Sequence, residues 1–235
     1  MADEARLRIW ITRAQPGAAA TAERVATLGH DPVVEPLINL RPIPDARIDL
    51  DGVAALAFTS ANGVRAFADL SSERSLRVFA VGAATAQAAK VAGFRSVFSS
   101  DGDVAALAEG LAARKRELDG VVLHPGATEL AGDLVGILAG QGVEARTVAL
   151  YDSVPVSPPD GRIAELVGLD VALLHSPSAA RVLARFLKDH PAPKMRAVAL
   201  SKAVLKPLAR VRMAAKQSPP FPLEAALLNL IGRGR

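Results

Sequence analysis

The sequence of 235 residues contains no cysteine and no long apolar run. Without cysteine there is no disulfide bond, no thiolate nucleophile and no metal site built on sulfur, and a reducing compartment is the natural location. No apolar stretch approaches the roughly 18 residues of a membrane span, and the N-terminal segment lacks the apolar core of a signal peptide. We therefore expect a cytoplasmic protein with no membrane partner.

Aromatic residues are scarce at 4%, although 50% of the chain is hydrophobic. The core must therefore be built from Ala, Val and Leu, which suits closely packed α/β layers and disfavours a protein that stacks nucleic-acid bases on aromatic rings. The formal net charge is +4, and the basic residues are spread along the chain apart from Arg114-Lys115-Arg116, which we interpret as a solvated helix end. These features are compatible with a small anionic ligand and argue against a nucleic-acid partner.

Several common functional motifs are also missing. No Gly-x-Gly-x-x-Gly follows a predicted strand, the segment 124–134 lacks the Gly-Lys-Ser/Thr ending of a phosphate loop, and no Gly-x-Ser-x-Gly elbow is present. The four histidines, which are His30, His124, His175 and His190, show no metal-ligand spacing, so no metal site is expected. His124 and His175 each follow or end a predicted strand, where a histidine either lines a cleft or forms a structural hydrogen bond.

Two strand-to-helix corners lie close together in the sequence. The apolar run Val53–Phe58 ends at Thr59-Ser60-Ala61-Asn62 and is followed by apolar residues at helical spacing. A second buried strand, Val78–Val81, leads through Gly82 into an alanine-rich helix over Ala83–Val91. Two helix N-termini at one edge of a parallel sheet would present unpaired N–H groups that favour anions. Ordinary corners with capping hydroxyls would give the same pattern, and this alternative stays open.

The rest of the chain continues the alternation of strand and helix. Further strands are expected at Leu7–Ile11, Pro32–Glu35, Arg95–Phe98, Gly120–Leu123, Val143–Leu150, Val171–Leu174 and Ala197–Leu200. Further helices are expected at Ala18–Leu28, Asp103–Ala113, Thr128–Leu138, Ala179–Leu187, from Lys202 for a short length, and at Leu223–Ile231. The apolar face of the second of these helices recurs in the last at an offset of 119 residues. The periodicity thus indicates two copies of one α/β pattern.

Two proline-rich segments interrupt the alternation. The first, Pro36–Asp45, contains three prolines and predicts an extended connection, and the second contains Pro155, Pro158 and Pro159. If the chain leaves one lobe at the first segment and returns at the second, the lobes are residues 1–37 with 153–235, and residues 38–152. The periodicity alone equally allows a single boundary near Asp119.

Four short motifs resemble the uroporphyrinogen-III synthase family in their order and spacing. They are FTSANGV from Phe58, AVGAATA from Ala80, Ile11-Thr12-Arg13, and Leu150-Tyr151 ahead of the second proline-rich segment. The resemblance is weaker after Asp160. It implies an α/β fold of two flavodoxin-like parallel-sheet lobes joined by two extended crossover segments, with the substrate in the cleft. It therefore favours the interleaved division of the chain.

The resemblance also implies a reaction. The family's substrate, hydroxymethylbilane, is a linear tetrapyrrole with eight carboxylates that closes spontaneously to the wrong isomer. The enzyme, a lyase, assists departure of the terminal hydroxyl, directs the azafulvene at the substituted carbon of ring D, and passes through a spiro intermediate to the isomer with ring D inverted. This chemistry requires orientation of the ligand and no cofactor. A cytoplasmic monomer is expected.

Polar groups near predicted strand ends supply the candidate site. The resemblance supports Tyr151 as general acid, although an aromatic residue at a hinge between lobes can serve only in packing. The candidate substrate-binding residues are Thr12, Arg13, Ser60, Asn62, Thr85, Ser176, Ser178 and Lys202. Arg13 is the best partner for a carboxylate because its planar fork binds two oxygens, although an arginine that caps a sheet edge is an equal alternative.

The corner that follows Ala197–Leu200 departs from the family pattern. It reads Ser201-Lys202-Ala203-Val204 where the first corner has glycine and threonine, so the family's hydroxyl contacts do not carry over. We expect Ser201 to cap the helix and Pro207 to end it early. Lys202 would then either meet a substrate carboxylate or remain solvated.

Two other functions compete with the synthase. A two-lobed binding protein could close on a small anion without reacting it. A sugar or nucleotide transferase is disfavoured by the missing phosphate loop and acidic metal ligands. A change in the isomer ratio would distinguish the synthase from the binding protein.

Overall fold

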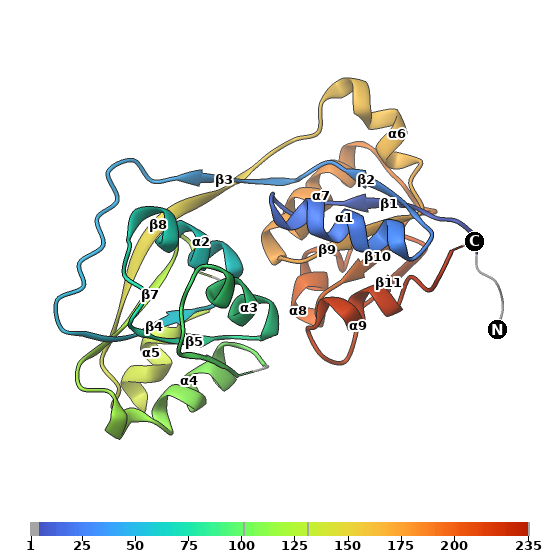
Figure 1. Cartoon of the computed structure of the whole chain (residues 1–235). Coiled ribbons are helices and arrows are strands. Elements are labelled where there is room, and N and C mark those ends of the chain that lie inside the picture. The colour runs from blue at the N-terminus through green and yellow to red at the C-terminus, as the bar shows by residue number, and fades with distance from the viewer. Residues whose placement is uncertain (1–4, 101, 131, 235) are drawn as a thin grey trace. The chain divides into compact units, whose positions relative to one another are not determined.

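The computed structural model describes residues 5–100, 102–130 and 132–234, and the chain separates into two compact units (Figure 1). Unit 1 contains the chain up to Leu40 and from Val154 onward, and unit 2 contains Arg41–Ser153. Each unit is built on a parallel sheet with helices packed against it, so the predicted α/β fold with two parallel sheets is confirmed. Across the described residues, no helix is both long and apolar enough to span a bilayer.

The sheet of unit 1 has five strands in the order β11-β10-β9-β1-β2. Its strands are β1 (Arg8–Ile11), β2 (Asp31–Val34), β9 (Val171–Leu174), β10 (Arg196–Ala199) and β11 (Ala215–Gln217). Its helices are α1 (Gly17–Thr27), α6 (Ile163–Val167), α7 (Pro177–Asp189), α8 (Lys202–Leu205) and α9 (Glu224–Asn229). Numbered along the unit, the spatial order of the strands is 2-1-3-4-5, which is the flavodoxin-like order.

Alternation along the strands of unit 1 produces two separate apolar layers. Trp10 packs with residues of α7 on one face of the sheet, whereas Ile9 and Ile11 pack with Val25 of α1 and Leu227 of α9 on the other. Because helices cover both faces of a parallel sheet, its central strands must be apolar on both sides. This requirement explains why the apolar run in β9 is continuous and does not alternate with polar residues.

The sheet of unit 2 has six strands in the order β3-β8-β7-β4-β5-β6. Its strands are β3 (Ile38–Pro42), β4 (Val53–Phe58), β5 (Arg77–Ala80), β6 (Val97–Ser99), β7 (Val121–Ala127) and β8 (Ala145–Pro155). Strands β3 and β8 each include residues that belong to unit 1. Its helices are α2 (Ala61–Leu70), α3 (Ala83–Val91), α4 (Val104–Ala112) and α5 (Leu134–Gly140). One face of the sheet packs on α4 and α5, and on the other the rings of Phe58, Phe67 and Phe94 contact one another.

The two sheets have the same spatial order once their different starting points in the chain are taken into account. Leaving aside β3, the second sheet reads β8-β7-β4-β5-β6 where the first reads β2-β1-β9-β10-β11. The recurrence of one pattern in the sequence therefore reflects two copies of one architecture, in which β4 corresponds to β9 and β7 to β1.

The proline-rich segments take part in the sheet more than the sequence predicts. The extended segment after Pro36 contains β3, which pairs with β8 at the edge of the second sheet. An edge position tolerates proline because one side of the strand needs no hydrogen-bond partner. For the same reason β8 continues through Pro155, beyond the predicted end at Leu150.

The predicted helix over Thr128–Leu138 is wrong in its first half. Strand β7 continues to Ala127, the N–H of Thr128 still donates to the carbonyl of Tyr151 at 3.0 Å, and the helix begins only at Leu134, with Asp133 as its cap. Sheet pairing outweighs local helical propensity here. The short elements α6 and β11 were not predicted, because neither is long enough to show a period.

Candidate functional site

Several candidate residues follow strands that flank the point in each sheet where the strand order reverses, whereas Thr85 follows β5, Lys202 follows β10 and Tyr151 lies within β8. This reversal lies between β4 and β7 in unit 2 and between β1 and β9 in unit 1. Ligands of open α/β sheets bind in the crevice at such a point, because the loops on its two sides run in opposite directions. Each unit therefore carries its own group of candidates.

The corner after β4 forms as the sequence predicts. Ser60 has extended backbone and caps α2, with its Oγ accepting a hydrogen bond from the N–H of Gly63 at 3.1 Å. A Cβ at Gly63 would lie 2.7 Å from the carbonyl oxygen of Pro125 in β7. Only glycine therefore lets the first turn of α2 approach β7 this closely.

Tyr151 lies in β8, within reach of this corner. Its hydroxyl is 3.2 Å from the Oγ of Ser60, and its side chain is 7% exposed. Burial raises the pKa of Tyr151, while the hydrogen bond with Ser60 and the positive charge of Arg65 act in the opposite direction. The phenol is therefore protonated at neutral pH, as a general acid must be before it reacts.

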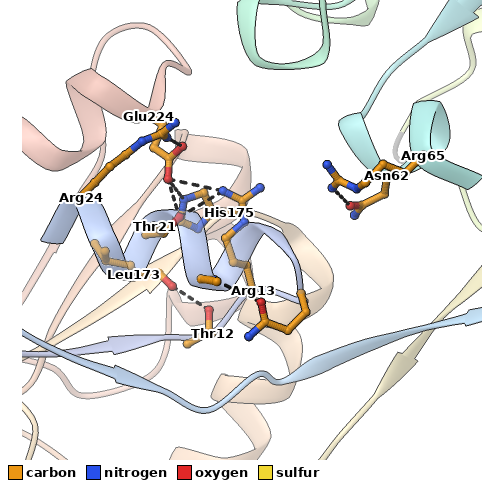
Figure 2. Close-up of polar contacts among 11 residues, drawn as sticks. Thr12, Arg13, Thr21, Arg24, Asn62, Arg65, Leu173, His175 and Glu224 are labelled. Atoms are coloured by element: carbon orange, nitrogen blue, oxygen red, sulfur yellow. Dashed lines mark hydrogen bonds and ion pairs between the residues drawn. The ribbon is translucent and has the colours of Figure 1, made fainter. Parts of the chain in front are cut away.

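Arg65 was not singled out from the sequence. Its Nη2 donates to the Oδ1 of Asn62, three residues earlier in α2 (Figure 2). The side chain is partly buried, and this burial lowers the pKa of Arg65, although the guanidinium stays charged. The i, i+3 spacing of Asn62 and Arg65 was the available signal, but it is common on helix surfaces.

His124 lies in β7 and is almost fully buried. Its Nε2 is 3.0 Å from the hydroxyl of Thr59, and its Nδ1 has no hydrogen-bond partner among the described residues. Burial lowers the pKa of His124 to about 4, so the ring is neutral at physiological pH. The structural interpretation of this histidine, as a ring hydrogen-bonded within the sheet, fits these contacts.

Thr85 occupies the first turn of α3 and is 5% exposed. Gly82 caps that helix without a side-chain hydrogen bond, and a Cβ there would meet nothing within 4 Å. There is open space beside Gly82, whereas the side chain of Thr85 is buried. Contact between Thr85 and a substrate stays a prediction.

In unit 1, the end of β1 carries two candidates with different surroundings. Thr12 is fully buried, and its hydroxyl donates to the carbonyl of Leu173 at 2.6 Å, so this hydroxyl ties β1 to β9 in the sheet. Arg13 turns the other way and forms an ion pair with Glu224, with 3.4 Å between Nη1 and Oε1 (Figure 2).

Glu224, the first residue of α9, is the centre of a charged cluster that the sequence did not reveal. Its carboxylate accepts from Thr21 and Arg24 as well as from Arg13, and its side chain is 15% exposed. Burial alone would raise the pKa of Glu224, but the contacts with His175, Thr21 and Arg13 outweigh it and lower the pKa to about 2. The carboxylate is therefore charged at any physiological pH.

His175 borders the same cluster at the end of β9. Its Nε2 lies 3.5 Å from Oε1 of Glu224, but neither ring nitrogen has a hydrogen-bond partner in the part of the chain that the structure describes. Burial is the largest influence and lowers the pKa of His175, against the effect of Glu224. The ring is therefore neutral near pH 7, and its approach to Glu224 is not an ion pair there.

The candidate serines of unit 1 and Ser201 lie at the starts of helices. The Oγ of Ser176 caps α7 by accepting from the N–H of Ala179 at 3.2 Å, and Ser178 accepts from Nη2 of Arg181 at 2.9 Å. Ser201 caps α8 by accepting from the N–H of Val204, as predicted.

The helix α8 ends after four residues, and a 3₁₀ turn with Pro207 follows, so the predicted early end is confirmed. Lys202 is exposed on the first turn of α8. Its contact with a substrate carboxylate stays a prediction.

The structure thus brings the candidates together in two groups. Ser60, Asn62 and Tyr151 share the corner of unit 2, joined by the unpredicted Arg65. The candidates of unit 1 lie at the ends of β1, β9 and β10, where Glu224 joins them. Glu224 was missed because 211 residues separate it from Arg13 and no local pattern connects them. Among the described residues, no group of three or more His, Asp or Glu side chains could hold a metal ion.

A family model described as uroporphyrinogen-III synthase HemD matches residues 19–229 of the chain. The porphyrin biosynthesis protein HemD of Ruminiclostridium josui is 27% identical over 211 residues, which are 82% of this chain. The chain spans only 42% of the length of that curated relative.

Two solved structures share the fold. The uroporphyrinogen-III synthetase of Helicobacter pylori has a TM-score of 0.65 at 16% identity, with 96% of this chain and 98% of that chain covered. A mutant uroporphyrinogen III synthase of Thermus thermophilus has a TM-score of 0.54 at 19% identity, with 96% and 97% covered. At these identities the likeness shows the fold alone.

Proposed function

Because the family model matches residues 19–229, the chain belongs to the uroporphyrinogen-III synthase family, and we propose from this premise that it converts hydroxymethylbilane to uroporphyrinogen III. The observation that carries the proposal at the level of the site is the hydrogen bond between Tyr151 and Ser60 at the corner of unit 2. It places a protonated phenol at the corner that follows β4, and a synthase needs such a group whereas a simple binding protein does not.

The proposed reaction begins with loss of the terminal hydroxyl of the linear tetrapyrrole. The phenol of Tyr151 donates its proton to that oxygen, the carbon–oxygen bond breaks, and its electron pair leaves with the oxygen as water. The lone pair of the pyrrole nitrogen stabilises the electron-poor carbon as a cationic azafulvene, and the substituted carbon of ring D attacks it to form a spiro intermediate. Fragmentation and recombination of this intermediate then invert ring D. A proton released as the macrocycle forms restores the phenol. Proton donation of this kind typically accelerates a reaction by ~10²–10⁴-fold.

The remaining candidates would orient the substrate. The ligand carries eight carboxylates, and hydrogen-bond donors and cations bind such groups strongly in partly buried positions. We propose that Arg13, held by Glu224, and the hydroxyl groups of Ser176 and Ser178 contribute to this set, with Lys202 at its edge. The hydroxyl of Thr12 would act through the strand pair that it fixes, and Thr85 would contact the substrate from the first turn of α3. The proposed chemistry requires no cofactor.

The decisive experiment is a coupled assay in which a deaminase generates hydroxymethylbilane in the presence of the protein. Uroporphyrinogen isomers are then oxidised and separated by chromatography. Isomer III should dominate at a rate proportional to protein concentration. Isomer I alone, formed at the rate seen without protein, would refute the synthase and leave a binding protein. A cytoplasmic location and a monomeric state remain predictions for fractionation and sedimentation.

A further inference from the structure

The hydrogen bonds of Ser60 restrict how it can interact with Tyr151. A serine hydroxyl has one proton and two lone pairs, and one lone pair already accepts the N–H of Gly63. In the resting state either hydroxyl can donate across the 3.2 Å that separates Ser60 and Tyr151. After Tyr151 gives its proton away, the phenolate can only accept, so Ser60 must donate to it.

The helix that Ser60 caps also carries a positive charge close to its start. Arg65 lies in α2 five residues after Ser60, and its Nη2 is hydrogen-bonded to the Oδ1 of Asn62. Asn62 and Arg65 therefore form a contact pair on the same helix whose cap, Ser60, touches Tyr151. The positive charge of Arg65 acts on Tyr151 and lowers the pKa of its phenol against the effect of burial.

We propose that Ser60 and Arg65 together stabilise the phenolate of Tyr151 that proton donation leaves behind, and that Asn62 positions Arg65 for this role. The inference rests on the proposed function for its catalytic meaning, since the phenolate forms when the leaving hydroxyl takes the proton of Tyr151. A partly buried cation and one neutral donor would then lower the energy of a charge that exists only after the proton has moved. Ser60 and Arg65 would be positioning residues, and Tyr151 the group that touches the substrate.

Other charged and titratable groups near Tyr151 are already engaged. Asp152, the next residue in β8, accepts from Thr128 of β7 at 2.6 Å and pairs with Arg41 of β3 at 3.5 Å. His124 of β7 is neutral at physiological pH. The charge of Asp69, which also lies in α2, raises the pKa of Arg65 and so opposes the effect of burial on that pKa. Arg65 is the cation whose charge directly stabilises the ionised phenol.

The chain offers a direct measurement because Tyr151 is its only tyrosine. The ultraviolet difference spectrum of tyrosinate, recorded against pH, therefore reports the ionisation of Tyr151 alone, without substrate. Arg65→Gln should raise the apparent pKa of Tyr151 by roughly half a unit to one unit, since a nearby charge of opposite sign is lost. Arg65→Lys keeps the charge and should restore most of the shift. Tyr151→Phe must abolish the signal.

Arg77→Gln is the matched control. Arg77 begins β5, so it lies at the amino edge of the same sheet, and it pairs with Glu117 at the surface. Removing its charge should leave the titration of Tyr151 and the rate unchanged, because exposed charges are screened over about 10 Å. Ser60→Thr retains the hydroxyl and cap, whereas Ser60→Ala should raise the pKa of Tyr151 as Arg65→Gln does.

Steady-state kinetics then separate phenolate stabilisation from substrate binding. Arg65→Gln should lower kcat about 10-fold with little change in KM, because the phenolate appears only after binding. An unchanged tyrosinate pKa in folded Arg65→Gln and Ser60→Ala, or a raised KM with unchanged kcat, would overturn the proposal. If the pKa shifts as expected but no variant, nor the parent, makes isomer III, the stabilisation of the phenolate stands and the synthase function fails.

Discussion

Each unit has the same strand-to-helix corner, but different side chains surround it. After equivalent strands, Thr59-Ser60 in unit 2 corresponds to His175-Ser176 in unit 1, and each serine caps the helix that follows. Five residues after each cap an arginine donates to the second residue of the helix, at Asn62 in one unit and Ser178 in the other. The cap and the arginine bond thus persist in both copies of one architecture.

The surroundings of the two corners differ in charge. The histidine at each corner is neutral near pH 7. In unit 2 the serine meets a phenol. In unit 1 the histidine faces the carboxylate of Glu224, which is held by two arginines. Both helices therefore begin with a serine cap, whereas the side chains around the two caps differ. We propose that unit 2 supplies the proton and unit 1 the charge for substrate carboxylates.

The largest effect should come from cutting the chain. A fragment of residues 38–152 contains the whole second sheet except the end of β8 and should fold alone, whereas residues 1–119 lack β7 and β8 and should not. Amide dispersion in heteronuclear spectra measures both. A well-dispersed spectrum from residues 1–119 would contradict the interleaved division and return the boundary to the region of Asp119.

Tyr151→Phe removes the proton donor of unit 2 and should lower kcat roughly 10- to 1000-fold while leaving the fold intact. Loss of one hydrogen bond to Ser60 should cost only about 1 kcal/mol of stability. The measurement is formation of isomer III beside a thermal unfolding curve. Unchanged turnover would return Tyr151 to a packing role.

Glu224→Gln tests the charged cluster of unit 1. The folded pKa is lowered to about 2, so the stabilisation is fully present above the unfolded pKa near 4.5 and is lost as pH falls from 4.5 to 2. The variant should lose about 2 to 3 kcal/mol at pH 7, and its stability should depend less on pH in that window. Urea unfolding at several pH values measures this.

Glu165→Gln is the control for that experiment. Glu165 pairs with Arg8 and Arg162 at the surface of the same unit, and these exposed pairs should each contribute less than about 1 kcal/mol. Equal losses in the two variants would show that the cluster around Glu224 contributes no more than a surface ion pair.

His175 affects stability at higher pH than Glu224 does. Because the folded pKa of His175 is lowered, stability should fall as pH drops below about 6.5.

Gly63→Ala tests the close approach of α2 to β7. The added Cβ would meet the carbonyl of Pro125 at 2.7 Å, so the helix must shift and the contact of Ser60 with Tyr151 should weaken. We expect a net loss of about 1 to 3 kcal/mol and reduced kcat. Gly140→Ala, where nothing lies within 4 Å, should be neutral or stabilising. A thermal shift assay with both variants measures the difference.

The smallest effect is expected for Lys202→Gln. If Lys202 meets a substrate carboxylate, KM should rise about two- to fivefold, kcat should change little, and the dependence of KM on salt should flatten. Lys206→Gln, which removes an exposed charge a turn later, should change none of these. Identical behaviour of the two variants and the parent would show that Lys202 is only a solvated lysine.

Elements with a strong local signal could be predicted from the sequence. Strands β4 and β9 and helix α3 have the predicted bounds, because a buried run closed by a small or polar residue is a pattern within one segment. The caps at Ser60 and Ser201 were predictable for the same reason. Elements whose existence depends on a distant partner were not: β3, β11 and the extension of β7 are strands because neighbouring strands pair with them.

The candidate site divides in the same way. The sequence by itself determined which residues end strands and begin helices, and so brought Ser60, Asn62 and Arg13 into consideration, whereas Tyr151 came from the family resemblance. Only the tertiary structure decided that Tyr151 meets Ser60, that Glu224 meets Arg13 from the far end of the chain, and that Thr12 is turned into the sheet. The physical reason is that capping and periodicity are fixed by bonds within a few residues. Burial and ion pairing depend instead on which strands the fold makes neighbours.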